Sequence, residues 1–435
     1  MLLPNDFEAL ARSGDLACSW EAFVASLDLP SPVSVHINDR LSASEIFGDM
    51  LAERVPHNAA GYYLKHRPKF TSDPLLHGGC YYVQEANSMA LATYLEKYVA
   101  RNAIALDMCA APGGKSIIIS QYLKACGFIV ANEPMPKRAN VLAENLQKWG
   151  NDNFMVTRAF PDELAKIKIA FDFILVDAPC SGEGMFRKEE EAVSQWSTSN
   201  VMQCAERQKE IVANAWNLLK DDGVMIYSTC TYNHFEDEDV VSWICDELGG
   251  VVAEQRHFYP HIDKGEGLFM AVIFKRQQAS VSRQASVVKA DFEHEPLHHS
   301  YSYCYAGERL VAIQKNFESV VNAVRKCVSV VVSGTEVAQQ KGRKYVPCHA
   351  LALSKYRDEI LSQFKDIHLE YNTVDLSLSM AMTYLRGDVL CELDCERGYV
   401  LLTYRDCAIG WGNNVANRVN NLYPHQWRVL SANYA

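Results

Sequence analysis

Between about residues 71 and 275, strand-like and helix-like segments alternate along the chain. The strand-like segments are dense in Ile, Val and Phe without polar alternation, a pattern typical of strands buried on both faces. The clearest are AIALDMC (103–109), GFIVANEP (127–134), FDFILVDAP (171–179), VMIYSTC (224–230) and LFMAVIFK (268–275). Strands that alternate with helices form a mostly parallel, doubly wound sheet. The sequence therefore predicts an α/β, Rossmann-like domain at 71–275.

The rest of the 435-residue chain divides into further regions, in line with the two to four domains expected from its length. Residues 1–70 combine helical patterning with a short strand-like segment, SVHIND (34–39). The segment 276–290, rich in Ser, Gln and Ala, is predicted to be a linker. Two smaller units are expected at 291–370 and 371–435, and the second is rich in short strands and glycine-containing turns.

The composition and the N-terminal sequence favour a cytoplasmic protein. No apolar run approaches the roughly 20 residues of a membrane span, and the early acids of MLLPNDFEALARSGD are not typical of a secretory signal. The 14 cysteines have irregular spacing, which favours reduced thiols over a disulfide scaffold. Cys391 and Cys395, with Cys407 nearby, have no histidine at zinc-finger distance, so no metal is expected.

The net charge of the whole chain disfavours nucleic-acid binding, but one segment of the chain is basic. The net charge is −11, whereas phosphate contacts need Lys and Arg. Between Lys275 and Ala350, however, 11 basic residues stand against 6 acidic ones. This segment is either a solvated face or an RNA-facing module, and charge alone favours the solvated face.

A glycine-rich turn, DMCAAPGGKS (107–116), separates one of these strands from a helix. This is the nucleotide-binding position of a doubly wound sheet. A P-loop would need glycine where Cys109 stands, and the dinucleotide motif GxGxxG is absent. S-adenosylmethionine carries no phosphate, so its loop needs close backbone approach, which Gly113 and Gly114 allow. Glu133, at the end of the next strand, is then placed to accept hydrogen bonds from ribose hydroxyls.

Two apolar strands end in the same way, each followed by a cysteine, in ILVDAPCSGEGMFRK (174–188) and YSTCTYN (227–233). Carbon 5 of cytosine becomes reactive towards a methyl donor when a thiolate adds at carbon 6, which is covalent catalysis. Such a site needs a thiolate, an acid near ring N3 and the exocyclic amine, and a second group that helps to release the product. Neighbouring strand ends can supply these groups as Asp177, Cys180 and Cys230. The chemistry alone leaves open which cysteine attacks.

Residues around the two cysteines are expected to support them. The turn of the first loop is shaped by Pro179, Gly182 and Gly184. Two further residues of this loop, Ser181 and Lys188, can touch an RNA phosphate backbone. After the second cysteine, Asn233-x-x-Glu236 matches a capping box and is followed by acids suited to a first helical turn. A helix that begins there would place Cys230 near its N-terminal end and lower the pKa of the thiol.

These motifs resemble those of the Nol–Nop–Sun family of RNA cytosine-C5 methyltransferases, and within it the bacterial RsmF branch. The resemblance rests on DMCAAPGGKS, VDAPCSGEGMFRK, STCTYN and YLKHRPKFTSDPLLHGGCYYVQEANSM (63–89), and LALSK (351–355) adds to it. It implies a class I methyltransferase sheet whose last strand is antiparallel. It also implies an N-terminal RNA-binding region at 1–70, an RsmF-type intermediate domain at 291–370 and a PUA-like RNA-binding module at 371–435.

Residue roles follow from the matching motifs. The resemblance implies that Cys230 is the nucleophile, that Cys180 assists release, and that Asp177 lies between the methyl donor and the base. The residues that it implies for binding S-adenosylmethionine are Cys109, Ala110, Ala111, Pro112, Gly113, Gly114, Lys115, Glu133 and Asp177. It implies no metal.

Two places depart from the family pattern. Where many relatives carry an acid that contacts the adenine, this chain has Phe160, and we expect either that Phe160 stacks on the adenine or that Asp162 replaces the acid. In SVHINDR (34–40), relatives usually have Arg at the place of His36 and Pro at the place of Asp39. The exchange at His36 weakens the expectation of an RNA contact there, in agreement with the negative net charge.

The leading hypothesis is a methyltransferase that modifies C5 of an unstacked cytosine in the decoding region of 16S rRNA. The same chemistry would serve a tRNA methyltransferase. A third hypothesis is a non-catalytic RNA-binding ribosome assembly factor, favoured only by Phe160, and a fourth is a P-loop ATPase. We expect a monomer whose partner is RNA.

Overall fold

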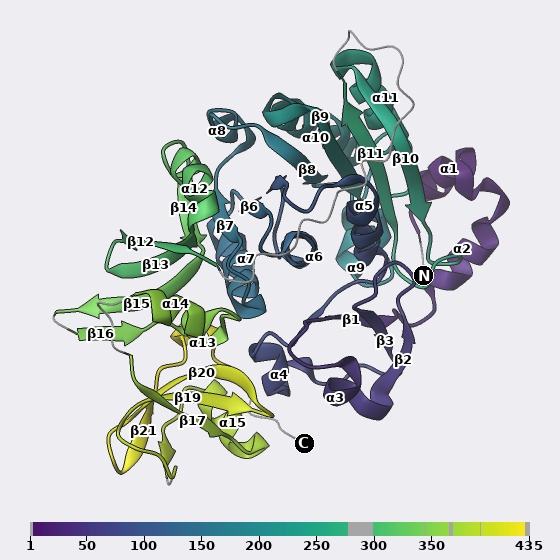
Figure 1. Cartoon of the computed structure of the whole chain (residues 1–435). Helices are drawn as coiled ribbons and strands as arrows, with labels where there is room; N and C mark the ends of the chain where they lie inside the picture. Colours follow the sequence, from purple (N-terminus) through teal and green to yellow (C-terminus); the bar gives the residue numbers. More distant parts are fainter. Residues whose placement is uncertain (1–2, 277–298, 343, 365–368, 392, 431–435) are drawn as a thin grey trace.

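The computed structural model describes residues 3–276, 299–342, 344–364, 369–391 and 393–430. These residues form four β-sheets, and Figure 1 follows them from the purple N-terminal part to the yellow C-terminal part. The linker expected at 276–290 lies, apart from Arg276, outside the described residues. No helix in the described part of the chain has the length and apolar character needed to cross a membrane.

The largest sheet has eight strands in the order β10-β11-β9-β8-β5-β6-β7-β14. Its parallel strands are β5 (Ile104–Asp107), β6 (Phe128–Asn132), β7 (Phe154–Arg158), β8 (Phe171–Asp177) and β9 (Leu219–Thr229). Its antiparallel strands are β10 (Gly250–Phe258), β11 (Leu268–Lys275) and β14 (Ser329–Ser333). The prediction of a mostly parallel sheet with an antiparallel last strand is confirmed, since β11 pairs antiparallel with β9. The sheet gains β14 from a later part of the chain.

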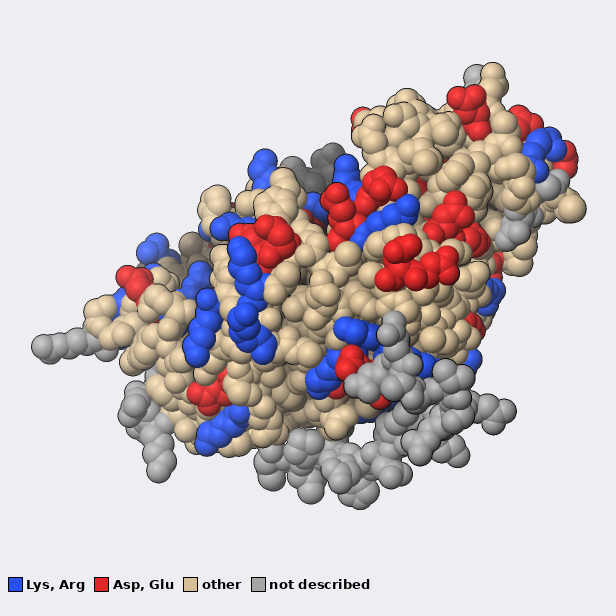
Figure 2. All heavy atoms as spheres, turned by 90° about the horizontal axis from the view of Figure 1, so that it is seen from above, with Lys and Arg blue, Asp and Glu red and all other residues tan. Residues whose placement is uncertain are grey.

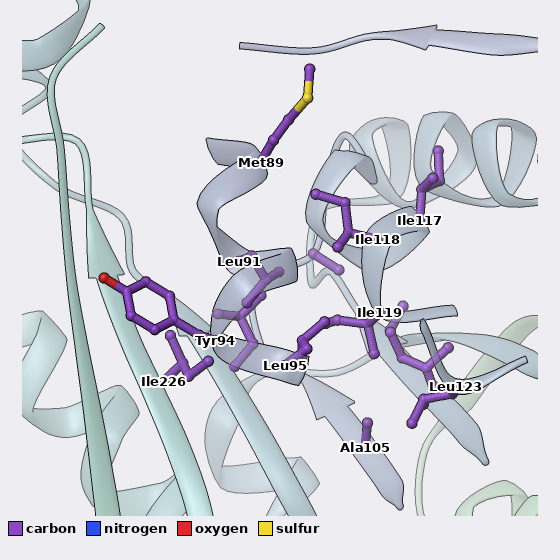
Figure 3. Packing of buried hydrophobic residues seen from close by; sticks show 14 of the residues in the cluster. Met89, Leu91, Tyr94, Leu95, Ala105, Ile117, Ile118, Ile119, Leu123 and Ile226 are labelled. Atoms are coloured by element: carbon purple, nitrogen blue, oxygen red, sulfur yellow. The ribbon is translucent and has the colours of Figure 1, made fainter. Parts of the chain in front are cut away.

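Helices cover both faces of this sheet. On one face lie α5 (Leu91–Tyr98), α6 (Gly114–Leu123) and α7 (Pro136–Trp149), and on the other α10 (Thr198–Leu218), α11 (Glu238–Leu248) and α12 (Glu318–Arg325). Ala105 and Leu106 are neighbours on β5 but enter different cores, because successive side chains of a strand point to opposite faces. Figure 3 shows the first core, in which Leu95 of α5 lies beside Ile119 of α6.

The N-terminal region extends past the expected boundary at residue 70, because β4 (Tyr81–Val83) pairs with β1. It consists of helices and a four-stranded antiparallel sheet in the order β2-β3-β1-β4. Its main elements are α1 (Asn5–Ser13), α2 (Trp20–Leu27), β1 (Val33–Ile37), α3 (Ala43–Phe47), β2 (Leu51–Arg54), β3 (Gly61–Leu64), α4 (Pro74–His77) and β4 (Tyr81–Val83). The rings of Phe7 and Phe186 lie 5.0 Å apart, and those of Phe23 and Tyr232 lie 5.1 Å apart. The two long N-terminal helices therefore pack on the loops that follow β8 and β9.

The C-terminal part contains two further sheets, seen in green and yellow in Figure 1. The first, ordered β12-β13-β15-β16, consists of β12 (Tyr301–Ala306), β13 (Arg309–Gln314), β15 (Thr335–Lys341) and β16 (Lys344–Pro347). Two helices, α13 (His349–Leu353) and α14 (Arg357–Gln363), follow it. The second, ordered β17-β19-β20-β21-β18, consists of β17 (Tyr371–Asp375), β18 (Leu390–Cys391), β19 (Gly398–Tyr404), β20 (Cys407–Asn414) and β21 (Arg418–Asn421). The helix α15 (Leu378–Leu385) connects β17 to β18 along the chain.

Three parts of the chain meet at Trp149, the last residue of α7. Nδ2 of Asn38 donates to the Trp149 carbonyl at 2.8 Å, and Lys355 forms an ion pair with Asp39 at 2.6 Å. His36 is buried with its ring 5.2 Å from that of Trp149. Burial lowers the pKa of His36 to about 4, so His36 is a neutral core residue and does not face a phosphate.

Candidate active site

The carboxyl ends of β6, β5, β8 and β9 lie side by side, so the loops that follow these strands meet at one edge of the sheet. The edge carries the glycine-rich turn after β5 and Glu133 after β6. It also carries Asp177 at the end of β8, and Cys180 and Cys230 in the loops after β8 and β9. The structure thus brings together the strand-end residues on which the sequence prediction depended.

The glycine-rich turn is held in a conformation that needs its glycines. Gly113 has a φ of +120°, which residues with a side chain rarely adopt, and α6 begins at the next residue. A Cβ on Gly114 would lie 3.1 Å from Nε2 of Gln84 and from Cε1 of Tyr82. The turn is therefore packed closely against the N-terminal region.

Helix α7 fixes the carbonyls of the turn and connects them to Glu133. Nδ2 of Asn145 donates to the carbonyl of Pro112 at 2.8 Å, and Nη2 of Arg138 donates to that of Ala111 at 3.0 Å. Nη1 of Arg138 also lies 3.1 Å from Oε2 of Glu133, which is buried. A buried carboxylate beside the turn can accept hydrogen bonds from a ligand's hydroxyl groups.

Asp107 lies buried beneath the turn. Its Oδ2 accepts a hydrogen bond from Oγ of Ser116 at 2.6 Å, and its Oδ1 has no partner among the described residues. Burial is the main reason that the pKa of Asp107 rises to about 7, and Asp177 raises it further. Burial likewise raises the pKa of the Cys109 thiol, so Cys109 lines the turn as a neutral group.

Asp177 connects the glycine-rich turn to β9. Its carboxylate lies 2.8 Å from Nζ of Lys115, and its Oδ1 accepts a hydrogen bond from Oγ of Ser228 at 2.6 Å. Burial lowers the pKa of Lys115, but the attraction of Asp177 together with Cys230 and Asp107 outweighs this effect, and the net pKa is raised. The Asp177 side chain is 32% exposed, so the carboxylate is open to a ligand.

Cys180 and Cys230 face each other across the two loops. Their Sγ atoms lie 3.1 Å apart, and the N–H of Cys230 donates to Sγ of Cys180 at 3.4 Å. The hydrogen bond with Cys230, and then burial, raise the pKa of the Cys180 thiol well above its usual value. Either sulfur can donate the hydrogen bond between them.

Two buried glutamates, which the sequence analysis did not place in the site, cross-link the cysteine loops. Glu183, in the loop after β8, accepts the N–H of Tyr232 at 2.8 Å. Glu236, in the loop after β9, accepts the N–H of Ser181 at 3.0 Å. Burial raises the pKa of Glu183 to about 7. In a single sequence Glu183 looks like a solvated loop charge and Glu236 like part of a capping box. Only their closeness to the cysteines in the sequence indicated a role in the site.

A third buried carboxylate, Asp237, holds the residues on both sides of Cys230. Its Oδ1 accepts hydrogen bonds from Oγ1 of Thr229 at 2.5 Å and of Thr231 at 3.1 Å. The backbone around the sulfur is thus fixed from below by one side chain.

The helix expected to begin directly after Asn233 begins instead at Glu238, so that prediction is wrong. Oδ1 of Asn233 does accept the N–H of Glu236 at 3.0 Å, but residues 234–237 form a turn. The reason is that Glu236 and Asp237 turn inwards to bind the cysteine loops. Cys230 therefore does not lie at the first turn of a helix.

Asp237, Glu238 and His257 bring three possible metal-ligand atoms within 4.8 Å of one another, and the described residues contain no other such group. Each already has a partner within the protein. Asp237 binds the threonines beside Cys230, and Nε2 of His257 lies 2.7 Å from Oε1 of Glu238. We assign no metal to this group.

Phe160 stands at the entrance of α8 (Pro161–Leu164) and is 57% exposed. With Pro134 and Arg158 it lines a pocket of about 410 Å³. Pro134 directly follows Glu133 in the sequence, so the exposed ring lies close to the turn after β6. Its stacking on an adenine stays a prediction.

The two residues predicted to touch phosphates differ in access. The hydroxyl of Ser181 is buried and contributes nothing to the surface. Lys188 is 32% exposed and lies 3.5 Å from Glu266. Only the lysine is open to an RNA backbone.

Comparison with protein families finds three matches in chain order. Residues 3–86 match the N-terminal domain of 16S rRNA methyltransferase RsmF, residues 94–274 match 16S rRNA methyltransferase RsmB/F, and residues 371–429 match the methyltransferase RsmF PUA domain. The three matched segments cover the N-terminal region, most of the largest sheet and the last sheet.

Full-length relatives and solved structures agree with these matches. The chain is 29% identical to ribosomal RNA small subunit methyltransferase F of Aeromonas hydrophila, over 94% of this chain and 93% of that protein. It is 27% identical to the protein of the same name from Psychromonas ingrahamii, over 93% of each. The structure of NSun6 from Pyrococcus horikoshii has the same fold over 63% of this chain and 98% of its own, with a TM-score of 0.56 and 20% identity.

Proposed function

The chain belongs to the RsmF branch of the 16S rRNA methyltransferases, which are S-adenosylmethionine-dependent enzymes, and we propose that it methylates carbon 5 of a cytosine in 16S rRNA through a covalent adduct. The observation that carries the proposal is the pair of sulfurs, 3.1 Å apart, at the same strand edge as the glycine-rich turn. Methylation of a nitrogen or an oxygen needs no thiol, whereas carbon 5 needs activation by a nucleophile.

The residues around the glycine-rich turn fit S-adenosylmethionine. The φ of +120° at Gly113 brings backbone rather than side chain to the ligand. The buried carboxylate of Glu133 is suited to ribose hydroxyls, and the exposed ring of Phe160 is suited to the adenine. Asp177 borders the same turn through Lys115. When bound, the donor would supply an electrophilic methyl group, and these residues would hold it at the strand edge that also carries the cysteine pair.

Cys230 is the proposed nucleophile. Its thiolate forms a bond with carbon 6 of the cytosine, and the electron pair of the C5–C6 bond becomes available at carbon 5. Asp177, held by Lys115 and Ser228, accepts a hydrogen bond from the exocyclic amine, and a second one from ring N3 once N3 has taken up a proton from solvent as the adduct forms. Carbon 5 takes the methyl group, and the donor leaves as S-adenosylhomocysteine. The proton on carbon 5 then passes to solvent, the bond between carbon 6 and sulfur breaks, and the thiolate of Cys230 returns as ring N3 gives up its proton.

Cys180 is the proposed release-assisting residue. The raised pKa of its thiol supports a neutral role beside a charged sulfur. The distance of 3.1 Å between the two sulfurs lets Cys180 reach an adduct formed on Cys230. The matching motifs, Thr-Cys at Cys230 and Pro-Cys at Cys180, support this assignment over the opposite one.

The test uses the purified protein, methyl-labelled S-adenosylmethionine and three RNA samples from cells that lack the gene: naked 16S rRNA, assembled small subunits and tRNA. We expect label at carbon 5 of a cytosine in 16S rRNA, naked or assembled, located by bisulfite sequencing. Label in tRNA alone would favour the tRNA alternative. The absence of label in all three samples would overturn the proposal.

A further inference from the structure

A groove of about 870 Å³ lies between the N-terminal region and the catalytic domain. Its walls are formed by residues 30–34, 64–67 and 83–85 of the N-terminal region, together with Lys188 and Lys264. Ligand pockets usually measure about 300–1,000 Å³. The groove is therefore large enough for a ligand that exceeds a single nucleoside.

The groove is positively charged although the chain is not. Lys65, Arg67, Lys188 and Lys264 line it against one acid, Glu85, while the net charge of the chain is −11. On the face seen in Figure 2, Lys and Arg are interspersed with Asp and Glu and do not form one basic surface. A local excess of cations between two walls attracts an anionic ligand.

The cations of the groove are available to such a ligand. Both carboxylate oxygens of Glu85 accept backbone N–H groups of the following turn, at 2.9 and 2.7 Å. Lys264 pairs with Glu53, and both side chains are more than half exposed. Lys188 lies 3.5 Å from Glu266, which also binds a neighbouring arginine. An exposed pair such as Lys264–Glu53 contributes only about 0–1 kcal/mol, so a phosphate can replace Glu53 as the partner of Lys264.

The groove borders the candidate active site on two sides. Gln84, in its wall, would lie 3.1 Å from a Cβ on Gly114 of the glycine-rich turn. Lys188 belongs to the same loop as Cys180. Lys264 lies in the connection between β10 and β11, whose backbone packs on that loop. The groove therefore shares walls with the glycine-rich turn and with the loop that carries Cys180.

We propose that this groove binds the single-stranded RNA that flanks the target cytosine, with phosphates on Lys65, Arg67, Lys188 and Lys264. The inference rests on the proposed function, since it takes the target base to lie at the cysteine pair. A base that enters such a site must leave its stack, so the nucleotides beside it are extended and expose their phosphates. A positive groove that follows the backbone is the usual way to bind a single strand.

The test measures binding of a fluorescein-labelled, single-stranded oligoribonucleotide of about 12 nucleotides to the full chain, by anisotropy, over a range of KCl concentrations and without methyl donor. Arg67→Gln and Lys264→Gln should each weaken binding about three- to tenfold and lower the slope of log Kd against log salt by about 0.7. The control is Lys220→Gln, which removes a cation paired with Asp172 at 2.7 Å. Lys220 lies near the start of β9, at the opposite end of the strand from Cys230 and on the order of 25 Å away.

A second variant separates charge from packing, because the guanidinium of Arg67 also lies 5.4 Å from the ring of Phe70. Arg67→Lys should keep the wild-type salt slope. The proposal that the groove binds single-stranded RNA would be overturned if both Gln variants kept the wild-type affinity and salt slope. Equally tight binding of a duplex of the same sequence would also overturn it. The binding assay does not depend on methyl transfer. If the protein modifies no RNA but the Gln variants still bind RNA more weakly, the proposed function is rejected and RNA binding in the groove is kept.

Discussion

Glu183, from the loop after β8, accepts the N–H of Tyr232 in the loop after β9, and Glu236, from the loop after β9, accepts the N–H of Ser181 in the loop after β8. Both carboxylates are buried. Each cysteine loop is therefore held by a carboxyl group that the other loop carries. The spacing of the two sulfurs is set by the protein before any RNA binds.

Exchange of each cysteine should give a different defect. Cys230→Ala removes the nucleophile and should lower methyl transfer at least about a thousandfold. Cys180→Ala should still form the adduct but release it slowly, so a covalent protein–RNA complex should accumulate on a denaturing gel. Cys245→Ala, on α11, is the matched control. Near-normal turnover of Cys230→Ala would show that another group attacks the ring.

Glu236→Gln should slow catalysis more than it weakens substrate binding. The amide nitrogen of Gln would face one of the N–H groups from which the carboxylate now accepts a hydrogen bond. The loss of that hydrogen bond costs about 1–3 kcal/mol. We expect kcat to fall about ten- to a hundredfold while KM for S-adenosylmethionine stays within about twofold, because the change moves the sulfurs and leaves the donor turn in place. Glu206→Gln, at an exposed position of α10, is the control. A loss of stability without a slower rate of adduct formation would contradict this role.

Asp107→Asn should change how stability depends on pH. The pKa of Asp107 is raised from 3.8 to about 7, so between these values the folded protein keeps a proton that the unfolded chain has lost. The contribution of this group to stability is therefore complete below about pH 4 and disappears as the pH rises through 7. Since one unit of pKa corresponds to about 1.4 kcal/mol, the loss amounts to roughly 4 kcal/mol.

The Asn side chain stays neutral throughout, so the Tm of Asp107→Asn relative to the wild type should rise between pH 5 and pH 8. Thermal melts followed by circular dichroism at intervals of half a pH unit would measure this. A difference in Tm that does not depend on pH would mean that Asp107 is already charged in the folded protein.

Phe160→Ala should weaken binding of the methyl donor about three- to tenfold, as expected for the loss of one stacked ring. Phe160→Trp should keep or strengthen it. The ring is 57% exposed, so neither change should alter Tm by more than about 1 °C. Isothermal titration with S-adenosylmethionine checks both variants. If Phe160→Ala binds the donor with unchanged affinity, another residue contacts the adenine, and Asp162 is the first candidate.

The central sheet and its rim could be predicted because their signal is local. Asp177 and Cys230 each follow an apolar run, and parallel strands place their carboxyl ends on one edge. The strand β14 (Ser329–Ser333) has an equally apolar sequence, VVV between two serines. Its pairing with β7, however, joins segments far apart in the chain, and no periodicity in either segment specifies that partner.

The buried carboxylates around the cysteines could not be predicted for a different reason. In the sequence, Glu183 lies between two glycines of a turn, and Glu236 and Asp237 open an acidic run that looks like the start of a helix. Water is the default partner of such charges. Their burial depends on donors supplied by Tyr232 and Ser181, and these donors come into place only when both loops have folded.

The N-terminal helices are synthesised long before the cysteine loops on which they pack. Phe7 and Phe23 leave the ribosome long before Tyr232, and at about 5–20 residues per second the delay is on the order of 10 to 40 s. During synthesis the apolar faces of α1 and α2 therefore remain without their final partner. A gene fragment that starts after Leu27 would leave the outer sides of both loops in water, and should yield an aggregating product even though every reacting residue is present.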